Sequence, residues 1–170
     1  MNVSKRFSLT FILLALFLLP AAFAQNDKNS ETAVCTYDDG MEISVRYTPA
    51  EYKRGYEIPN GKPWAPSDVK MLLFTPTDIV AGNTTIPTGA YSMYILRNKN
   101  DWTLIVSRNI KDGTPYDESQ DVVRIPMGTG KISSPKSIFS ATFGHIAPRT
   151  CSIQIYFGDT GAFGDFTRKN

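Results

Sequence analysis

The stretch from Tyr91 to Ser107 constrains the fold more than any other part of the sequence. Two runs rich in aromatic and β-branched residues, 91–96 and 102–107, flank a polar segment at 97–101. This pattern predicts two antiparallel strands joined by a five-residue hairpin loop. Apolar side chains occupy consecutive positions in both runs, so neither face of the hairpin is polar. Because an isolated hairpin of this kind would leave an apolar face in water, we predict that it lies inside a layered β structure.

The loop length also predicts which residues of the two strands face one another. We expect Leu96 opposite Trp102, with two further pairs on that face: Tyr94 with Leu104, and Ser92 with Val106. The other face would carry the pairs Ile95 with Thr103 and Met93 with Ile105. Both faces would then need cover from other parts of the chain.

The first 24 residues are organised as a secretory signal peptide. The basic pair Lys5-Arg6 precedes an apolar segment over 9–19, and Ala22-Phe23-Ala24 forms a cleavage site of small residues. Pro20 ends the apolar segment well before the ~20 residues that a membrane-spanning helix needs. No cysteine follows the cleavage site to carry a lipid. We therefore expect export to the periplasm or the extracellular space, with no membrane anchor after signal cleavage.

The charge balance argues against a nucleic-acid partner. The full chain carries 18 Lys and Arg against 16 Asp and Glu. The signal segment holds two basic residues, Lys5 and Arg6, and no acidic one, so the mature chain is formally neutral. Its longest basic runs are pairs, Lys53-Arg54 and Arg168-Lys169. Proteins that bind DNA or RNA usually present a basic patch or stripe instead.

The remainder of the chain has the length of one domain. We expect a disordered N-terminus at 25–32 and a single β-sandwich domain at 33–170. Turn residues separate short apolar stretches, and no helical period of useful length follows the signal peptide. The sequence therefore predicts an all-β fold, an antiparallel β-sandwich or jelly roll of about eight strands.

Besides the hairpin, we expect strands at 33–37, 41–47, 70–74, 79–80, 122–127, 138–143 and 150–157. In the second of these, Met41, Ile43, Val45 and Tyr47 alternate with polar residues and are expected to point inward. We expect irregular loops at 48–69, 111–120 and 131–136, and a turn-rich surface tail at 158–170.

Cys35 and Cys151 lie near the two ends of the mature chain and are its only cysteines. In an oxidising compartment such a pair favours a disulfide. The bond would join the first strand to the last and close a long loop, for which chain entropy gives ~4.7 kcal/mol. Two unpaired buried thiols are the alternative, because sequence does not show whether the two Cβ atoms come within bonding distance.

His145 is the only histidine, so a multi-histidine metal site is excluded and any Ser-His-Asp machinery would depend on this residue. Four acidic residues gather near Tyr116: Asp112, Asp117, Glu118 and Asp121. Such a cluster can hold calcium, and two carboxylates can perform glycoside hydrolysis. The spacing matches no calcium-loop signature, and a solvated loop is the simpler interpretation. We predict no catalytic residue, no metal and no cofactor.

The loop at 48–69 contains four prolines and three large aromatic residues, Tyr52, Tyr56 and Trp64. Aromatics on a long loop either cover a sheet edge or line a binding surface. We predict a non-enzymatic domain that binds a small ligand, a glycan or an envelope protein through loops 48–69 and 112–121. The candidate ligand-binding residues are Tyr56, Trp64, Tyr116 and Asp117. The alternatives are a glycan-directed hydrolase that uses carboxylates of 112–121 with His145, and a structural accessory domain.

Three sequence segments stand out together: Ile86-Pro87-Thr88-Gly89 with Asp101-Trp102-Thr103, Gly61-Lys62-Pro63-Trp64, and Asp121-Val122-Val123-Arg124. They resemble segments of a family of secreted bacterial proteins, domain of unknown function 2911. The hairpin, from Ile86-Pro87-Thr88-Gly89 to Asp101-Trp102-Thr103, is similar to the family's Leu-Pro-Ala-Gly-Thr-Tyr-Ser-Leu strand and the Glu-Trp-Thr start of its partner. Gly61-Lys62-Pro63-Trp64 resembles the family's Gly-Lys-x-Trp, and Asp121-Val122-Val123-Arg124 resembles its later Asp-x-x-x-Arg strand. The resemblance covers roughly residues 40–157 and implies a secreted bacterial β-sandwich.

The sequence departs from the family pattern after Trp64. The family usually continues Arg-Thr-Gly-Ala-Asn-Glu, whereas this chain continues Ala65-Pro66-Ser67-Asp68-Val69-Lys70. It therefore lacks the arginine, the asparagine and the glutamate of that segment, and the resemblance implies no catalytic residues here.

Overall fold

The computed structural model describes residues 29–169, so the predicted signal peptide and residues 25–28 lie outside the described residues. The described chain forms strands and two 3₁₀ turns: β1 (Glu31–Thr36), β2 (Glu42–Tyr47), β3 (Pro63–Trp64), η1 (Pro66–Asp68), β4 (Met71–Thr75), β5 (Ile79–Ala81), β6 (Thr84–Ile86), β7 (Gly89–Asn98), β8 (Asp101–Ser107), η2 (Glu118–Gln120), β9 (Asp121–Ala147) and β10 (Thr150–Arg168). The predicted all-β, antiparallel class is confirmed. No helix within 29–169 is long and apolar enough to cross a membrane.

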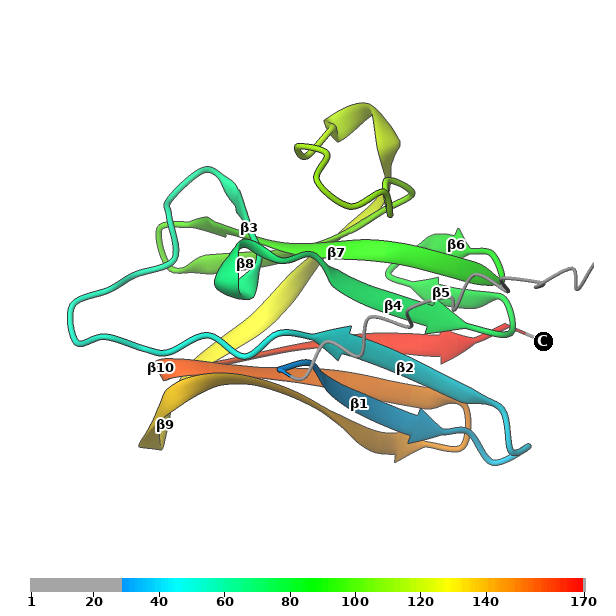
Figure 1. Ribbon diagram of the computed structural model, residues 1–170. Coiled ribbons are helices and arrows are strands. Elements are labelled where there is room, and N and C mark those ends of the chain that lie inside the picture. The colour runs from blue at the N-terminus through cyan, green and yellow to red at the C-terminus, as the bar shows by residue number, and fades with distance from the viewer. Residues whose placement is uncertain (1–28, 170) are drawn as a thin grey trace, which may run out of the picture.

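One antiparallel path of hydrogen-bonded strands runs in the order β1-β2-β4-β7-β8-β9-β10-β5-β6, with β3 paired to β7 beside it. Strand β9 belongs to both halves of this path. Its residues 121–127 pair with β8, and its residues 128–147 pair with β10. Strands β1, β2, β4, β7 and β8 form one layer, and β10, β5 and β6 form the other. Figure 1 shows β9 running from beside β8 to its place along β10. The long strand thereby folds the sheet into a two-layer sandwich.

A second connection joins the layers beyond the end of β2. The backbone NH of Tyr52 donates to the carbonyl of Ser137 (2.7 Å), and the NH of Phe139 donates to the carbonyl of Ala50 (2.7 Å). Residues 50–52 therefore run as a short extra strand along β9. This pairing fixes the start of the long loop against the sandwich.

The space between the layers is filled by one large apolar cluster. Its fully buried members include Ile43, Met93, Ile153, Phe139 and Phe166. The disulfide between Cys35 of β1 and Cys151 of β10 lies in the same cluster, with the two Cα atoms 6.2 Å apart. The predicted bond between the first and last strands is confirmed.

The predicted hairpin is confirmed as β7 and β8, but its register was wrong by one residue. Trp102 pairs with Arg97 and not with Leu96, Tyr94 pairs with Ile105, and Met93 pairs with Val106. The strands extend to Asn98 and start again at Asp101, so the connection has two residues instead of five. The polar segment continues the strand because the long loop supplies its partners: Gly61 NH donates to Arg97 O (2.7 Å), and Lys99 NH donates to Asn60 Oδ1 (2.6 Å).

Both faces of the hairpin are covered, as its apolar pattern predicts. Met93, Ile95, Leu104 and Val106 belong to the main core. On the opposite face, Tyr94 and Ile105 pack with Ala65, and Leu96 and Tyr116 add to that smaller cluster. The loops at 48–69 and 109–120 therefore supply the cover on the outer side.

The strands β9 and β10 are longer than the sequence predicts. The expected loop at 131–136 and the expected surface tail at 158–170 are both wrong, because β9 continues to Ala147 and β10 continues to Arg168. Ala162 and Phe166 of the supposed tail lie in the core, and Thr167 pairs with Val80 of β5. The glycines of this segment mark a register shift and close side-chain packing instead of a chain end.

Two smaller expectations at the N-terminal hairpin also differ. Strand β1 begins at Glu31, inside the stretch predicted to be disordered. Met41 lies before β2 and is 41% exposed, whereas Ile43, Val45 and Tyr47 point inward as expected. Asp39 Oδ1 accepts from Met41 NH (3.3 Å), so the turn residues hold Met41 outside the strand.

Candidate functional site

Trp64 is a buried core residue that holds the long loop at 48–69 against the sandwich. It pairs with Ile95 across β3 and β7, and residues directly opposite each other project to the same side of a sheet. Its ring is buried and lies 5.4 Å from the ring of Phe157 and 5.8 Å from that of Phe139. Trp64 Nε1 donates a hydrogen bond to the hydroxyl of Tyr56 (3.1 Å). Trp64 therefore connects the core to an aromatic ring at the surface.

Two tyrosines of the long loop, Tyr52 and Tyr56, pack against the buried ring of Phe157. The ring of Tyr56 meets it edge-on at 5.9 Å, and that of Tyr52 at 5.3 Å. Tyr56 is 41% exposed, and Tyr52 is partly exposed. Edge-to-face contacts of this kind restrain a ring without hiding both of its faces. The loop thus presents restrained aromatic surface to solvent.

These tyrosines form one wall of a cleft of about 500 Å³, which we call the aromatic groove. Its other walls come from the β7–β8 turn and from the region where β9 begins to pair with β10. Aromatic rings are contributed by Tyr52, Tyr56, Trp102 and Phe157. Charged side chains are contributed by Glu57, Arg97, Lys99, Lys131 and Asp159.

Most charges around the aromatic groove are already paired. Arg97 Nη1 lies 2.5 Å from Glu57 Oε2 and 3.2 Å from the carbonyl of Ile58, so it holds the loop to the hairpin. Lys131 Nζ lies 3.2 Å from Asp159 Oδ2. Lys99 has no ion-pair partner within 29–169. The groove therefore combines aromatic surface with polar groups and little net charge.

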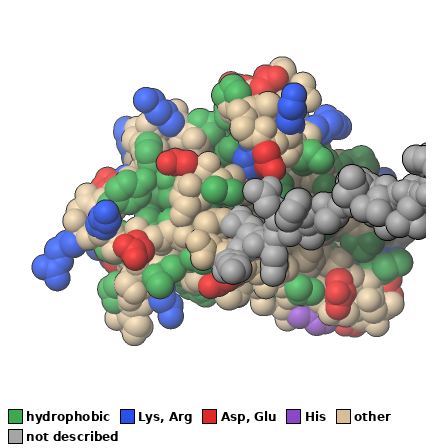
Figure 2. All heavy atoms as spheres, viewed as in Figure 1, with side chains coloured by type: hydrophobic (Ala, Val, Ile, Leu, Met, Phe, Trp, Pro, Cys, Tyr) green, Lys and Arg blue, Asp and Glu red, His purple; other side chains and the backbone are tan. Residues whose placement is uncertain are grey.

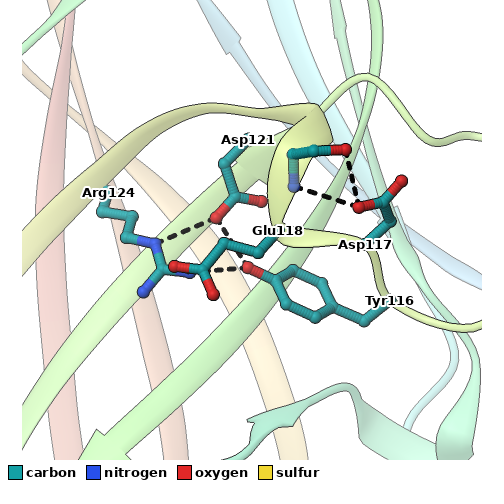
Figure 3. Close-up of polar contacts among 6 residues, drawn as sticks. Tyr116, Asp117, Glu118, Asp121 and Arg124 are labelled. Atoms are coloured by element: carbon teal, nitrogen blue, oxygen red, sulfur yellow. Dashed lines mark hydrogen bonds and ion pairs between the residues drawn. The ribbon is translucent and has the colours of Figure 1, made fainter.

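The second predicted loop builds a separate cluster, shown in Figure 3. The ring of Tyr116 packs edge-on against Tyr94 at 5.2 Å, and its hydroxyl donates to Asp121 Oδ2 (2.6 Å). Arg124 Nη2 donates to the same hydroxyl (2.7 Å), and Arg124 also pairs with Asp121 and Glu118, each at 2.9 Å. These side chains fasten the loop to the outer face of the hairpin.

Asp117 has a local structural role. Its Oδ1 accepts hydrogen bonds from the NH of Ser119 (3.0 Å) and from its hydroxyl (2.7 Å). The carboxylate therefore caps η2, as Figure 3 shows.

The structure does not bring the four predicted site residues into one pocket. Trp64 lies on the Ile95 side of β7, whereas Tyr116 lies on the Tyr94 side, and adjacent residues of a strand point to opposite faces. Only Tyr56 lines the aromatic groove, and Trp64 lies beneath it. Sequence reasoning missed Phe157, Arg97 and Lys131, which come from strands distant in sequence.

His145 and the acidic loop have different partners. His145 Nε2 lies 3.3 Å from Asp38 Oδ1 at the β1–β2 turn, and His145 itself is part of β9 opposite Cys151. Asp121 and Glu118 are engaged by Arg124 instead. Among residues 29–169, no ion pair joins His145 to a carboxylate of the 112–121 loop. Across the described range, no three His, Cys, Asp or Glu side chains are arranged to hold a metal ion.

Buried tyrosines are expected to limit the stability of the domain at alkaline pH. Burial is the main cause that raises the pKa of Tyr37, Tyr47 and Tyr116 to about 12. A raised tyrosine pKa means that the stabilising contribution is complete below pH ~10 and is lost as the pH rises towards 12. Tyr37 and Tyr47 are almost wholly buried, so we expect each to remove about 1.4 kcal/mol of unfolding free energy per pH unit in that window. Urea unfolding at several pH values between 8 and 11.5 measures this slope.

Tyr37→Phe is the matched control for the alkaline slope. The Tyr37 hydroxyl is buried without a hydrogen-bond partner among the described residues, so its removal breaks no bond. The variant should keep its stability at pH 8 and lose less of it above pH 10. Equal slopes for the variant and the parent would show that Tyr37 does not titrate in this way.

Comparison with known proteins adds one finding. A protein-family model described as "Protein of unknown function (DUF2911)" matches residues 29–163. The matched range includes the hairpin and all the side chains named above for the aromatic groove. No curated protein and no solved structure matches the chain.

Proposed function

Because the chain belongs to the DUF2911 family of proteins of unknown function, we propose its role from the groove itself: it is an exported, non-enzymatic domain that binds a glycan in the aromatic groove. The signal-peptide pattern supports export, and so does the Cys35–Cys151 disulfide, which forms and persists in oxidising compartments.

The observation that carries the proposal is the pair Tyr52 and Tyr56 standing on Phe157 beside a polar rim. A sugar ring has an apolar face of C–H groups and an edge of hydroxyls. The tyrosine rings match the apolar face. Glu57, Arg97 and Asn100 offer hydrogen-bond acceptors and donors to the hydroxyls. Small-ligand sites usually combine apolar walls with a few oriented polar groups in this way.

Charge supports a neutral ligand over a polyanion. The pairs Arg97–Glu57 and Lys131–Asp159 leave Lys99 as the single unpaired charge on the groove. On the face drawn in Figure 2, basic and acidic side chains are interspersed, and neither sign forms a continuous patch. Nucleic acids and other polyanions are held mainly by clustered positive charge.

We expect Tyr56→Ala to weaken glycan binding at least about tenfold, because one well-placed aromatic ring commonly contributes more than 1 kcal/mol at a binding site. The measurement is titration calorimetry of the mature protein against neutral oligosaccharides selected on a glycan array. Tyr56→Phe should keep most of the affinity, since it retains the ring.

Tyr116→Ala is the matched control, because it removes a tyrosine from the other predicted loop, on the opposite face of the hairpin. Its affinity should equal that of the parent protein. If Tyr116→Ala weakens binding and Tyr56→Ala does not, the site lies in the 112–121 loop, and the proposal for the groove is wrong. Failure of the parent protein to bind any glycan would also refute it.

A further inference from the structure

The outer face of the β9–β10 pair carries a second, uncovered surface. Along β10, Ile153, Ile155 and Phe157 enter the core, so Ser152, Gln154 and Tyr156 project from the other side. A shallow cleft of about 470 Å³ lies on that side. We call it the outer platform and define it by Ile132, Ile146, Gln154, Tyr156 and Phe163. Phe163 is 55% exposed and Ile146 is 56% exposed.

Glycines keep the outer platform flat. A Cβ at Gly128 would overlap the ring of Phe163, which lies directly on that backbone. A Cβ at Gly144 would stand 2.9 Å from Gln154 Nε2, and one at Gly161 would stand 3.0 Å from Ile132 Cγ2. The side chains of Phe163, Gln154 and Ile132 therefore pack flat against the backbone of these glycines instead of projecting away from the sheet. Tyr156 donates to Gln154 Oε1 (3.0 Å), which fixes two of them relative to each other.

The outer platform is continuous with the aromatic groove. Thr129, Gly130 and Lys131 line both. A Cβ built at Gly130 would have no atom within 4 Å, so no side chain stands above this residue. The two surfaces therefore meet at Gly130, and a ligand in the groove has room to extend over this residue towards the outer platform.

We propose that the aromatic groove and the outer platform together bind one linear, uncharged polysaccharide, an inference that rests on the proposed glycan-binding function. The charge of the surface supports this occupant: the residues that define the platform are uncharged, and Lys131 and Asp165 lie among the remaining lining residues. The stretch 152–163 of β10 spans about 36 Å at the rise of a β-strand, which suits an extended ligand of several sugar units.

The test compares short and long ligands on the mature protein. The probes are dimers and hexamers of β-linked glucose, N-acetylglucosamine and xylose, titrated by calorimetry. We expect a hexamer to bind at least about tenfold more tightly than its dimer. Phe163→Ala should abolish that difference and leave dimer affinity unchanged, because Phe163 lies on the outer platform and not in the groove.

Gly130→Phe is the second variant, designed to block the passage between the two surfaces. The open space at this position lets the fold accept the new ring, which an unchanged melting temperature would verify. It should also remove the hexamer advantage. Equal affinities of dimer and hexamer for the parent protein would overturn the inference and leave glycan binding in the groove intact. Absence of any binding would refute the proposed function together with it.

Sedimentation velocity tests the other candidate occupant of the outer platform, a second copy of this chain. The parent protein should sediment as a monomer. A dimer that Phe163→Ala converts to monomers would assign the outer platform to self-association and overturn the inference.

Discussion

Replacing both Cys35 and Cys151 with alanine is expected to lower the free energy of unfolding by about 4–5 kcal/mol. The bond joins residues 116 positions apart, so its loss releases a very long loop in the unfolded chain. Both side chains are buried, and alanine leaves only small cavities. For a domain of this size the melting temperature should fall by roughly 10–20 °C. Urea denaturation followed by circular dichroism gives both quantities.

The position of the disulfide predicts which properties survive its removal. It fastens β1 to β10, whereas the aromatic groove is built from the 52–58 loop, β7, β8 and the 129–131 and 157–160 segments. Glycan affinity well below the melting temperature should therefore be unchanged. The parent protein treated with a reductant is the natural control and should match the double variant. If the free energy of unfolding fell by less than about 1 kcal/mol, the disulfide would not stabilise the domain through loop closure.

The hairpin shows what local sequence pattern predicts well and where it fails. Aromatic and β-branched runs identify β7 and β8, because strand preference is carried by the residues themselves. The register depends on partners elsewhere in the chain. Arg97 is held in the strand by Gly61, and the NH of Lys99 in the turn after β7 is bonded by Asn60. Both partners are distant in sequence. A polar segment without such partners would form the longer loop that the pattern predicts.

The placement of the candidate site residues could not be predicted for a related reason. A one-residue step along β7 decides whether a neighbour packs on the Tyr94 side or on the Ile95 side. The sequence identifies Tyr56, Trp64 and Tyr116 as aromatics on loops, but it does not say which side each loop covers. The prediction for the glycine-rich end of β10 is wrong for a different reason. Gly161 and Gly164 are typical turn residues in the sequence, but they lie within a strand.

Trp64→Ala is expected to destabilise the domain by about 3–5 kcal/mol, the usual cost of removing a large buried aromatic side chain. The ring packs on Phe139 and Phe157, so its loss leaves a cavity in the middle of the core. The same change removes the hydrogen bond to the Tyr56 hydroxyl. Both stability and glycan affinity should fall, which chemical denaturation and calorimetry at 10 °C would measure separately.

Trp64→Phe separates the two roles of Trp64, because a phenyl ring keeps most of the packing but has no NH for Tyr56. We expect a smaller loss of stability, about 1–2 kcal/mol from the hydrogen bond and the reduced volume. Glycan affinity should still fall several-fold, since Tyr56 loses the bond that orients it. If Trp64→Phe binds as tightly as the parent protein, the contact with Phe157 alone positions Tyr56. If Trp64→Ala also keeps full affinity while folded, the core does not organise the groove, and the glycan site does not depend on Trp64.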